Sequence, residues 1–124
     1  MLSMRPDAIS DLSAESADGW DRVVFRNLSS LIGEIRAKEI AGRFRSDLGR
    51  RFLDVEDREI LRRDAHAVTS SAGMLGFANL CNAARQLEAT CEGGAPIPDC
   101  IAKVERAKEE AVQAIERFDL ASAV

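Results

Sequence analysis

The sequence predicts an all-α fold: an antiparallel, up-and-down four-helix bundle with an N-terminal helical extension. Only 5% of the 124 residues are aromatic and none is tyrosine, whereas 46% are hydrophobic and helix-forming Ala, Leu, Glu and Arg are plentiful. No proline interrupts the stretch from residue 7 to residue 95. Apolar residues recur there at steps of three and four, as they do along one face of a helix. A chain of this length forms one domain with one core.

Residues 1–33 are predicted to be a helical extension that packs on the bundle. Between residues 3 and 18 the only apolar anchors are Ile9 and Leu12, so a short helix and an extended arm both stay open. The next segment keeps helical spacing at Val24, Leu28, Leu31, Ile32 and Ile35. The next apolar residue, Ile40, comes five residues after Ile35, one more than helical spacing allows. Because Gly33 lies next to this irregularity, we expect a helix break there.

Residues 34–53 are predicted to form the first helix of the bundle. Its apolar face comprises Ile40, Ala41, Phe44, Leu48 and Phe52, and continues to Val55. The opposite face carries Arg43, Arg45, Asp47, Arg50 and Arg51. A charged face of this kind is normally solvated, and an acidic protein partner is the alternative.

The segments 55–74 and 77–92 carry the clearest periodicity. The first places Leu61, Ala65, Val68, Ala72 and Leu75 on one seam, and the second places Phe77, Leu80, Ala84, Leu87 and Cys91 on another. Only Gly76 separates the two seams, so the chain must reverse tightly and the two helices should pack side by side.

A fourth bundle helix is predicted over residues 97–119. Gly93 and Gly94 end the preceding helix and Pro96 precedes the next start. Its apolar positions are Ile97, Ile101, Val104, Ala111, Ile115 and Phe118. The bundle is therefore expected to span residues 34–120, with residues 121–124 as a frayed tail.

Composition excludes several classes of protein. A net charge of −4 lacks the basic excess that nucleic-acid binding normally needs. The three cysteines, Cys81, Cys91 and Cys100, have no metal-ligand spacing and are expected to pack as free thiols, so no metal site is predicted. No segment is apolar enough for a signal peptide or a membrane span. We therefore expect a cytoplasmic protein without nucleic-acid or membrane partners, and, since four closed helices leave no open seam, a monomer.

The single histidine, His66, is the candidate functional residue. It follows the seam residue Ala65 and so lies about 100° around the helix, at the edge of the buried face. The run from residue 65 to residue 80 resembles the signature of histidine phosphotransfer domains, approximately A-H-x-L-K-G-S-A-x-x-L-G-x-x-x-L. The matching residues are Ala65, His66, Ser71, Ala72, Leu75, Gly76 and Leu80, with Val68 in place of Leu, a following Leu87-Glu88 pair, and an upstream Phe44 and Leu48. The resemblance covers residues 34–93.

The sequence departs from the family pattern at two positions beside the histidine. The usual Lys is Thr69 and the usual Gly is Ser70, so a positive charge and some open space are missing. Arg62, one turn earlier on the same face, is the first candidate to replace the charge, and Arg63 and Arg85 are weaker candidates. By the resemblance, a residue of the next helix orients the imidazole: Glu88, with Gln86 as the alternative, although Glu88 can also be an ordinary surface carboxylate.

The resemblance implies a phosphoryl carrier that lacks ATP binding and autokinase activity. His66 would accept a phosphoryl group from a receiver-domain aspartate, in a hybrid histidine kinase or a response regulator, and pass it to another receiver. The domain would have no cofactor of its own, because the receiver supplies Mg²⁺. Receiver docking is expected around His66, with contributions from Gly73, Met74, Phe77, Arg43 and Arg45.

Two other function classes stay open. The first is a degenerate adaptor on the same fold, which binds receivers or kinases without being phosphorylated and would be indifferent to replacement of His66. The second, a metal or cofactor bundle, would need several inward-facing His or Glu residues on facing helices, and the chain has one histidine.

Overall fold

The structure, a computed structural model, describes residues 19–123, and the side chains of residues 19–117. Its helices are α2 (Arg22–Ile32), α3 (Glu34–Leu48), α4 (Arg58–Leu75), α5 (Ala78–Gly93) and α6 (Pro98–Ala123). No strand occurs in the described part of the chain, which confirms the all-α prediction. The expectations for Ile9, Leu12 and the side chain of Phe118 lie outside the described residues.

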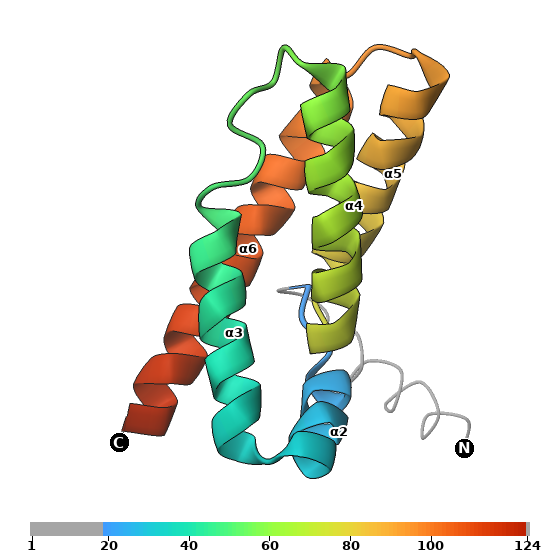
Figure 1. The fold of residues 1–124 in the computed structure, drawn as a ribbon. Coiled ribbons are helices and arrows are strands. Elements are labelled where there is room, and N and C mark those ends of the chain that lie inside the picture. Colours follow the sequence, from blue (N-terminus) through green and yellow to red (C-terminus); the bar gives the residue numbers. More distant parts are fainter. Residues whose placement is uncertain (1–18, 124) are drawn as a thin grey trace, which may run out of the picture.

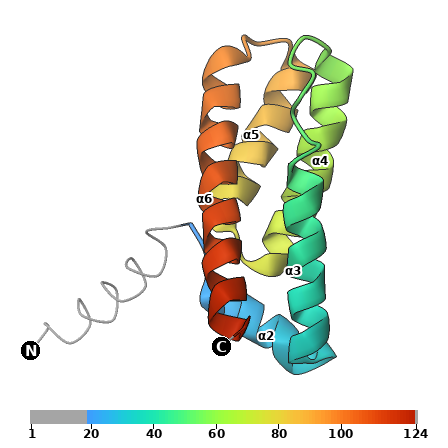
Figure 2. The same cartoon turned by 90° about the vertical axis from the view of Figure 1, so that its left-hand side faces the viewer.

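The four long helices form a bundle, and α2 lies across one end of it (Figures 1 and 2). In Figure 1 the chain runs up α3, down α4, up α5 and down α6. The most extensive contact is between α4 and α5, and α2 contacts both α3 and α4. The backbone N–H of Asp21 donates to the carbonyl of Gly76 (2.6 Å), so the start of α2 is held against the turn between α4 and α5.

Local capping explains where α4 begins and ends. The Asp57 carboxylate accepts from the backbone N–H groups of Glu59 (3.0 Å) and Ile60 (3.2 Å), so the helix begins at Arg58, three residues later than the periodicity indicated. Gly76 ends it in the left-handed conformation (φ 94°), which glycine adopts at little cost. The reversal predicted at Gly76 is thus confirmed.

The predicted end of the first bundle helix is wrong. α3 ends at Leu48 rather than at residue 53, and residues 49–57 form a loop. In this loop Phe52 has a positive φ (63°), which no helix accommodates, and Asp64 of α4 accepts its backbone N–H (2.9 Å). The Phe52 side chain still enters the core, whereas Val55 is exposed. The apolar spacing therefore continued past the helix because the loop folds back onto the bundle.

A second correction concerns the corner between α2 and α3. Leu31 and Ile35 continue the apolar spacing but are 83% and 76% exposed. Gly33, with φ 95°, breaks the helix between them as predicted, so Ile35 does not continue the face of α2. Leu31 precedes the break and is exposed, although Leu28 and Ile32 of the same helix pack partly against the core. At the other end of the chain, α6 continues four residues past its predicted end. The division into an extension, a bundle and a frayed tail stays a prediction.

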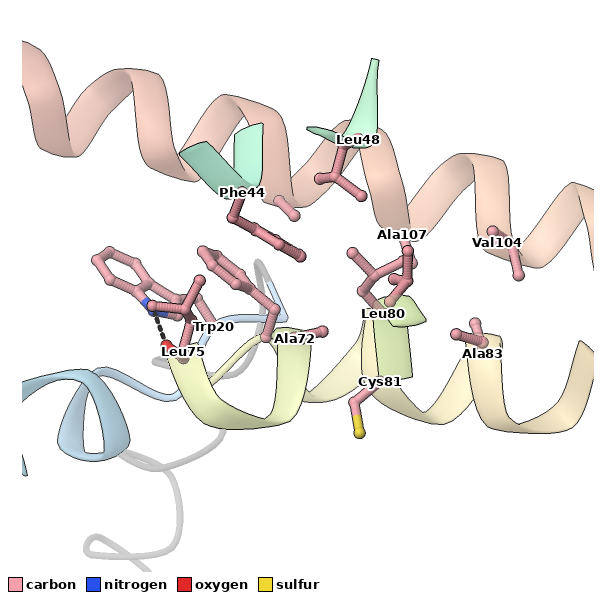
Figure 3. Packing of buried hydrophobic residues seen from close by; sticks show 14 of the residues in the cluster. Trp20, Phe44, Leu48, Ala72, Leu75, Leu80, Cys81, Ala83, Val104 and Ala107 are labelled. Carbon is pink, nitrogen blue, oxygen red and sulfur yellow. Dashed lines mark hydrogen bonds between the residues drawn. The ribbon is translucent and has the colours of Figure 1, made fainter. Parts of the chain in front are cut away.

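In the core, aromatic rings gather at one end and small and branched residues fill the rest (Figure 3). Phe77 lies between Trp20 (centroids 5.5 Å apart) and Phe44 (5.7 Å), and the Trp20 indole N–H donates to the Leu75 carbonyl (3.1 Å). Such ring pairs add about 0.5–1.5 kcal/mol each beyond their burial. Small buried residues also occupy the core along α4 and α5, and they comprise Ala65, Ala72 and Ala84. Ala83 lies beside Val104 of α6 (Figure 3).

All three cysteines are free thiols. Cys81 is buried, and Cys91 and Cys100 are half-buried near the α5–α6 turn. Burial raises the pKa of the Cys91 thiol. The cysteines therefore pack as small apolar residues, as their positions on the helices predicted.

Candidate functional site: an exposed histidine on α4

His66 lies midway along α4 with its side chain 72% exposed. Its neighbour Ala65 is fully buried, because it belongs to the seam that packs into the core. One residue farther along a helix turns about 100°, which carries the imidazole out of the core and onto the surface beside α5. The helix backbone thus holds the ring at a fixed place without covering it.

Glu88 of α5 contacts the histidine directly. The distance from His66 Nδ1 to Glu88 Oε2 is 2.9 Å. An ionised carboxylate can only accept a hydrogen bond, so Nδ1 carries the proton and donates it. In the neutral imidazole the other nitrogen, Nε2, then keeps its lone pair. Of the two residues expected to orient the ring, Glu88 therefore makes the contact.

Gln86, the alternative, lies on the other side of α5. It lines a hollow between α5 and α6 together with Lys103 and Arg106, away from His66. Two residues along a helix turn about 200°, so Gln86 and Glu88 cannot face the same neighbouring helix. The expectation that Gln86 could support the site is therefore corrected.

Arg62 is engaged by a carboxylate that the sequence analysis did not single out. Its Nε and Nη2 donate to the two oxygens of Glu59 (3.1 and 2.8 Å), and Arg63 adds a third bond. These bonds, chiefly those from Arg62, lower the pKa of Glu59 to about 2, and the same contact raises the pKa of Arg62. The spacing of Glu59 to Arg62 and Arg63, three and four residues, was the signal that could have found this pairing. Arg62 thus already has an anionic partner.

The two residues that depart from the family pattern have different surroundings. The Thr69 hydroxyl donates back to the Ala65 carbonyl one turn earlier (2.7 Å), so its only proton is used within the helix. Ser70 is exposed one turn after His66. Compared with the glycine of the family pattern, it adds one hydroxymethyl group. The site therefore has little bulk beside the imidazole but no charge from position 69.

The residues expected to dock a receiver divide into two groups. Gly73 is exposed on α4, and Met74 (47% exposed) lines a hollow with Arg43 between α3 and α4. Arg45 lies elsewhere, because it forms an ion pair with Glu116 of α6. Phe77 is only 2% exposed.

The expectation for Phe77 is corrected, since its ring fills the core between two other aromatic rings and offers no surface to a partner. Arg45 is exposed but belongs to the α3–α6 face of the bundle rather than to the His66 face. Of the expected docking set, Gly73 is thus exposed on the same helix as His66, and Met74 and Arg43 line the hollow on the α3 side of α4.

Among the described residues, no three His, Cys, Asp or Glu side chains come together as a metal site. The same part of the chain contains no helix that is long and apolar enough to span a bilayer.

Comparison with known proteins gives one match. The model of the Hpt domain family matches residues 26–118, which include all of α3, α4 and α5. No curated protein and no solved structure matches the chain significantly. The family match spans most of the chain and includes the histidine-bearing helix, and the structure has the helical bundle of such domains. The chain therefore belongs to the Hpt domain family, whose members are phosphocarriers with a histidine phosphotransfer role in phosphorelays.

Proposed function

We propose that this protein carries a phosphoryl group on His66 between receiver domains of a two-component phosphorelay. The observation that carries the proposal is the ring geometry: His66 is exposed, and Glu88 holds its Nδ1 so that Nε2 keeps its lone pair. An exposed neutral imidazole is a competent nucleophile near neutral pH. The protein need only present it, since the transfer depends on positioning and electrostatics.

The transfer takes place in one displacement at phosphorus. The Nε2 lone pair attacks the aspartyl phosphate of a receiver, the bond between phosphorus and the aspartyl oxygen breaks, and the carboxylate leaves with the electron pair. The imidazole gains positive charge, and the Glu88 carboxylate, 2.9 Å from Nδ1, stabilises that charge. In the second transfer an aspartate of another receiver attacks the phosphorus and the ring is released. Mg²⁺ belongs to the receiver's own site and needs no ligand from this chain.

The partners in this proposal are response-regulator receivers and a hybrid histidine kinase. Docking would use the exposed part of α4 around His66 and the adjoining hollow between α3 and α4, where Arg43 can meet acidic residues of a receiver. The protein has no kinase activity of its own in this proposal. A cytoplasmic location, which the three free thiols favour, and a monomeric state belong to it as well.

Purified protein incubated with phosphorylated receiver domains tests this function. We expect acid-labile phosphate to appear on the wild type and not on His66→Gln, which keeps a polar side chain of similar size but has no nucleophilic ring nitrogen. Binding of a receiver without label on the wild type would contradict the carrier function.

A second candidate function is a receiver-binding adaptor that is not phosphorylated. It is favoured by one observation: Thr69, which stands in place of the family Lys, and Arg62, the first candidate to supply the missing charge, are both engaged within α4. If this function is correct, His66→Ala binds receivers as tightly as the wild type and preserves signalling in cells.

A further inference from the structure

The missing charge beside His66 has a source on α5 rather than on α4. We propose that Arg85 binds the phosphoryl group on His66 Nε2 and supplies the positive charge that Thr69 lacks. This inference depends on the proposed carrier function, and it names the residue that makes transfer possible despite the two departures from the family pattern.

The pairing of α4 with α5 places Arg85 at the level of the site. Glu88 of α5 contacts His66 of α4. About one turn farther toward the end of α4, Cys81 Sγ of α5 donates to the Thr69 carbonyl (3.4 Å). Arg85 lies between Cys81 and Glu88 in the sequence of α5, four residues after one and three before the other. Because such spacings put all three on one side of a helix, Arg85 lies along the edge that faces His66 and Thr69.

The guanidinium group lies at this edge and is turned toward Cys81, away from the end of α5 on which Glu88 contacts His66. Its Nη2 lies 3.5 Å from Cys81 Sγ. The same sulfur would lie 3.5 Å from a Cβ added at Gly73, two turns after His66 on the same face of α4. The guanidinium group is thus held near Cys81 in this structure, and rotation of the long Arg85 side chain about its own bonds would bring it to the phosphoryl group on His66.

The partners of Arg85 leave its charge uncompensated. In the described part of the chain its hydrogen bonds go to neutral groups, the Asn82 amide oxygen (3.2 Å) and the Cys81 sulfur. Arg62, by contrast, shares two hydrogen bonds with an ionised carboxylate. A hydrogen bond to sulfur is weak. A doubly charged phosphoryl group, by contrast, offers three oxygens that can accept from the N–H groups of a planar guanidinium. Arg85 can therefore exchange its present contacts for the phosphoryl group at lower cost than Arg62.

The test measures labelling of His66 with two donors, a phosphorylated receiver and phosphoramidate. With phosphoramidate, Nε2 attacks phosphorus, the P–N bond breaks and ammonia leaves, so no docked protein is involved. We expect Arg85→Ala to be labelled roughly tenfold more slowly than the wild type with both donors, the loss of one charge-assisted contact. The control is Arg106→Ala, the same change of charge on α6, in the hollow between α5 and α6, and its labelling rate should differ from that of the wild type by less than about twofold.

A rescue variant separates charge from structure. Adding Thr69→Lys to Arg85→Ala puts the cation back at the position of the family pattern, and we expect it to restore most of the lost rate. Circular dichroism should show that all variants are folded, since Arg85 is exposed.

Four results would overturn the inference, and each has a distinct meaning. Unchanged phosphoramidate labelling of Arg85→Ala together with slower transfer from the receiver would make Arg85 a docking residue instead. Failure of Thr69→Lys to rescue would show that the missing charge is not what Arg85 supplies. Absence of label on the wild type with either donor would refute the carrier function itself, whereas a labelled wild type with an equally fast Arg85→Ala would refute this inference alone.

Discussion

Replacing Asp64 by alanine should destabilise the fold more than any substitution at an exposed carboxylate. Asp64 is buried on α4, where its Oδ1 accepts from Arg51 (3.0 Å) and its Oδ2 from the backbone N–H of Phe52 (2.9 Å). Without the carboxylate the Phe52 N–H is left without its partner, which costs about 1–3 kcal/mol. Arg51 keeps Asp47 (2.8 Å) and is partly exposed, so the lost ion pair adds only about 1 kcal/mol.

The expected loss is therefore about 2–4 kcal/mol in the free energy of unfolding. Urea denaturation followed by the fluorescence of Trp20, the one tryptophan, measures it. With a slope of about 2 kcal/mol per molar urea, the midpoint should fall by about 1–2 M. Asp64→Asn should lose less, because its amide oxygen can still accept one bond.

Glu56→Ala, which removes an exposed carboxylate from the same loop, is the control and should stay within about 0.5 kcal/mol of the wild type. If Asp64→Ala is no less stable than Glu56→Ala, then Asp64 does not hold the loop onto α4 and the explanation given for the early end of α3 is wrong.

Two further predictions concern the turn at Gly76 and the ion pair at the start of α4. Gly76→Ala should lower the free energy of unfolding by at least about 2 kcal/mol, because a Cβ at φ 94° is strained and would overlap the Asp21 carbonyl oxygen. Gly42→Ala is the control and should be neutral or stabilising, because a Cβ there has nothing within 4 Å. Equal free energies of unfolding for the two variants would contradict this explanation of the turn. The pKa of Glu59 is lowered to about 2 from an ordinary value of 4.5, so the contribution of its contact with Arg62 to stability is complete above pH 4.5 and is lost as the pH falls toward 2. NMR titration of the Glu59 carboxyl carbon should give a midpoint near 2, whereas a midpoint near 4.5 would mean that this contact does not form in solution.

The fold could be predicted largely from apolar spacing, because each bundle helix buries one continuous stripe. Every seam residue of α4 and α5 from Leu61 to Leu87 is buried, and the structure also buries Asp64, Cys81 and Ala83, which lie outside the predicted seams. The end of α3 could not be predicted in this way. Phe52 keeps the helical phase, yet it reaches the core from a loop whose backbone is held by Asp64, a contact between residues twelve positions apart. The spacing of apolar residues indicates which side chains are buried, but it does not show whether they belong to a helix or to a loop.

For the candidate site, the sequence allowed the exposure of single residues on α4 to be predicted, but not their contacts with other helices. The position of His66 beside a buried alanine sufficed to predict its exposure. Its partner depends on which helix lies next to α4, so Glu88 and Gln86 could be told apart only once α5 was placed between α4 and α6. The partners of Arg62 and Arg85 likewise depend on three-dimensional neighbours, which the spacing of residues along one helix does not show.

The central claim is that Nε2 of His66 carries the phosphoryl group while Glu88 holds Nδ1. The most direct test is to phosphorylate ¹⁵N-labelled protein with a phosphorylated receiver and to record ³¹P and long-range ¹H–¹⁵N NMR spectra of the single histidine. We predict one phosphohistidine, with phosphorus coupled to Nε2 and a proton retained on Nδ1. Phosphorus on Nδ1, or a protein that binds the receiver and shows no phosphohistidine signal, would contradict the account.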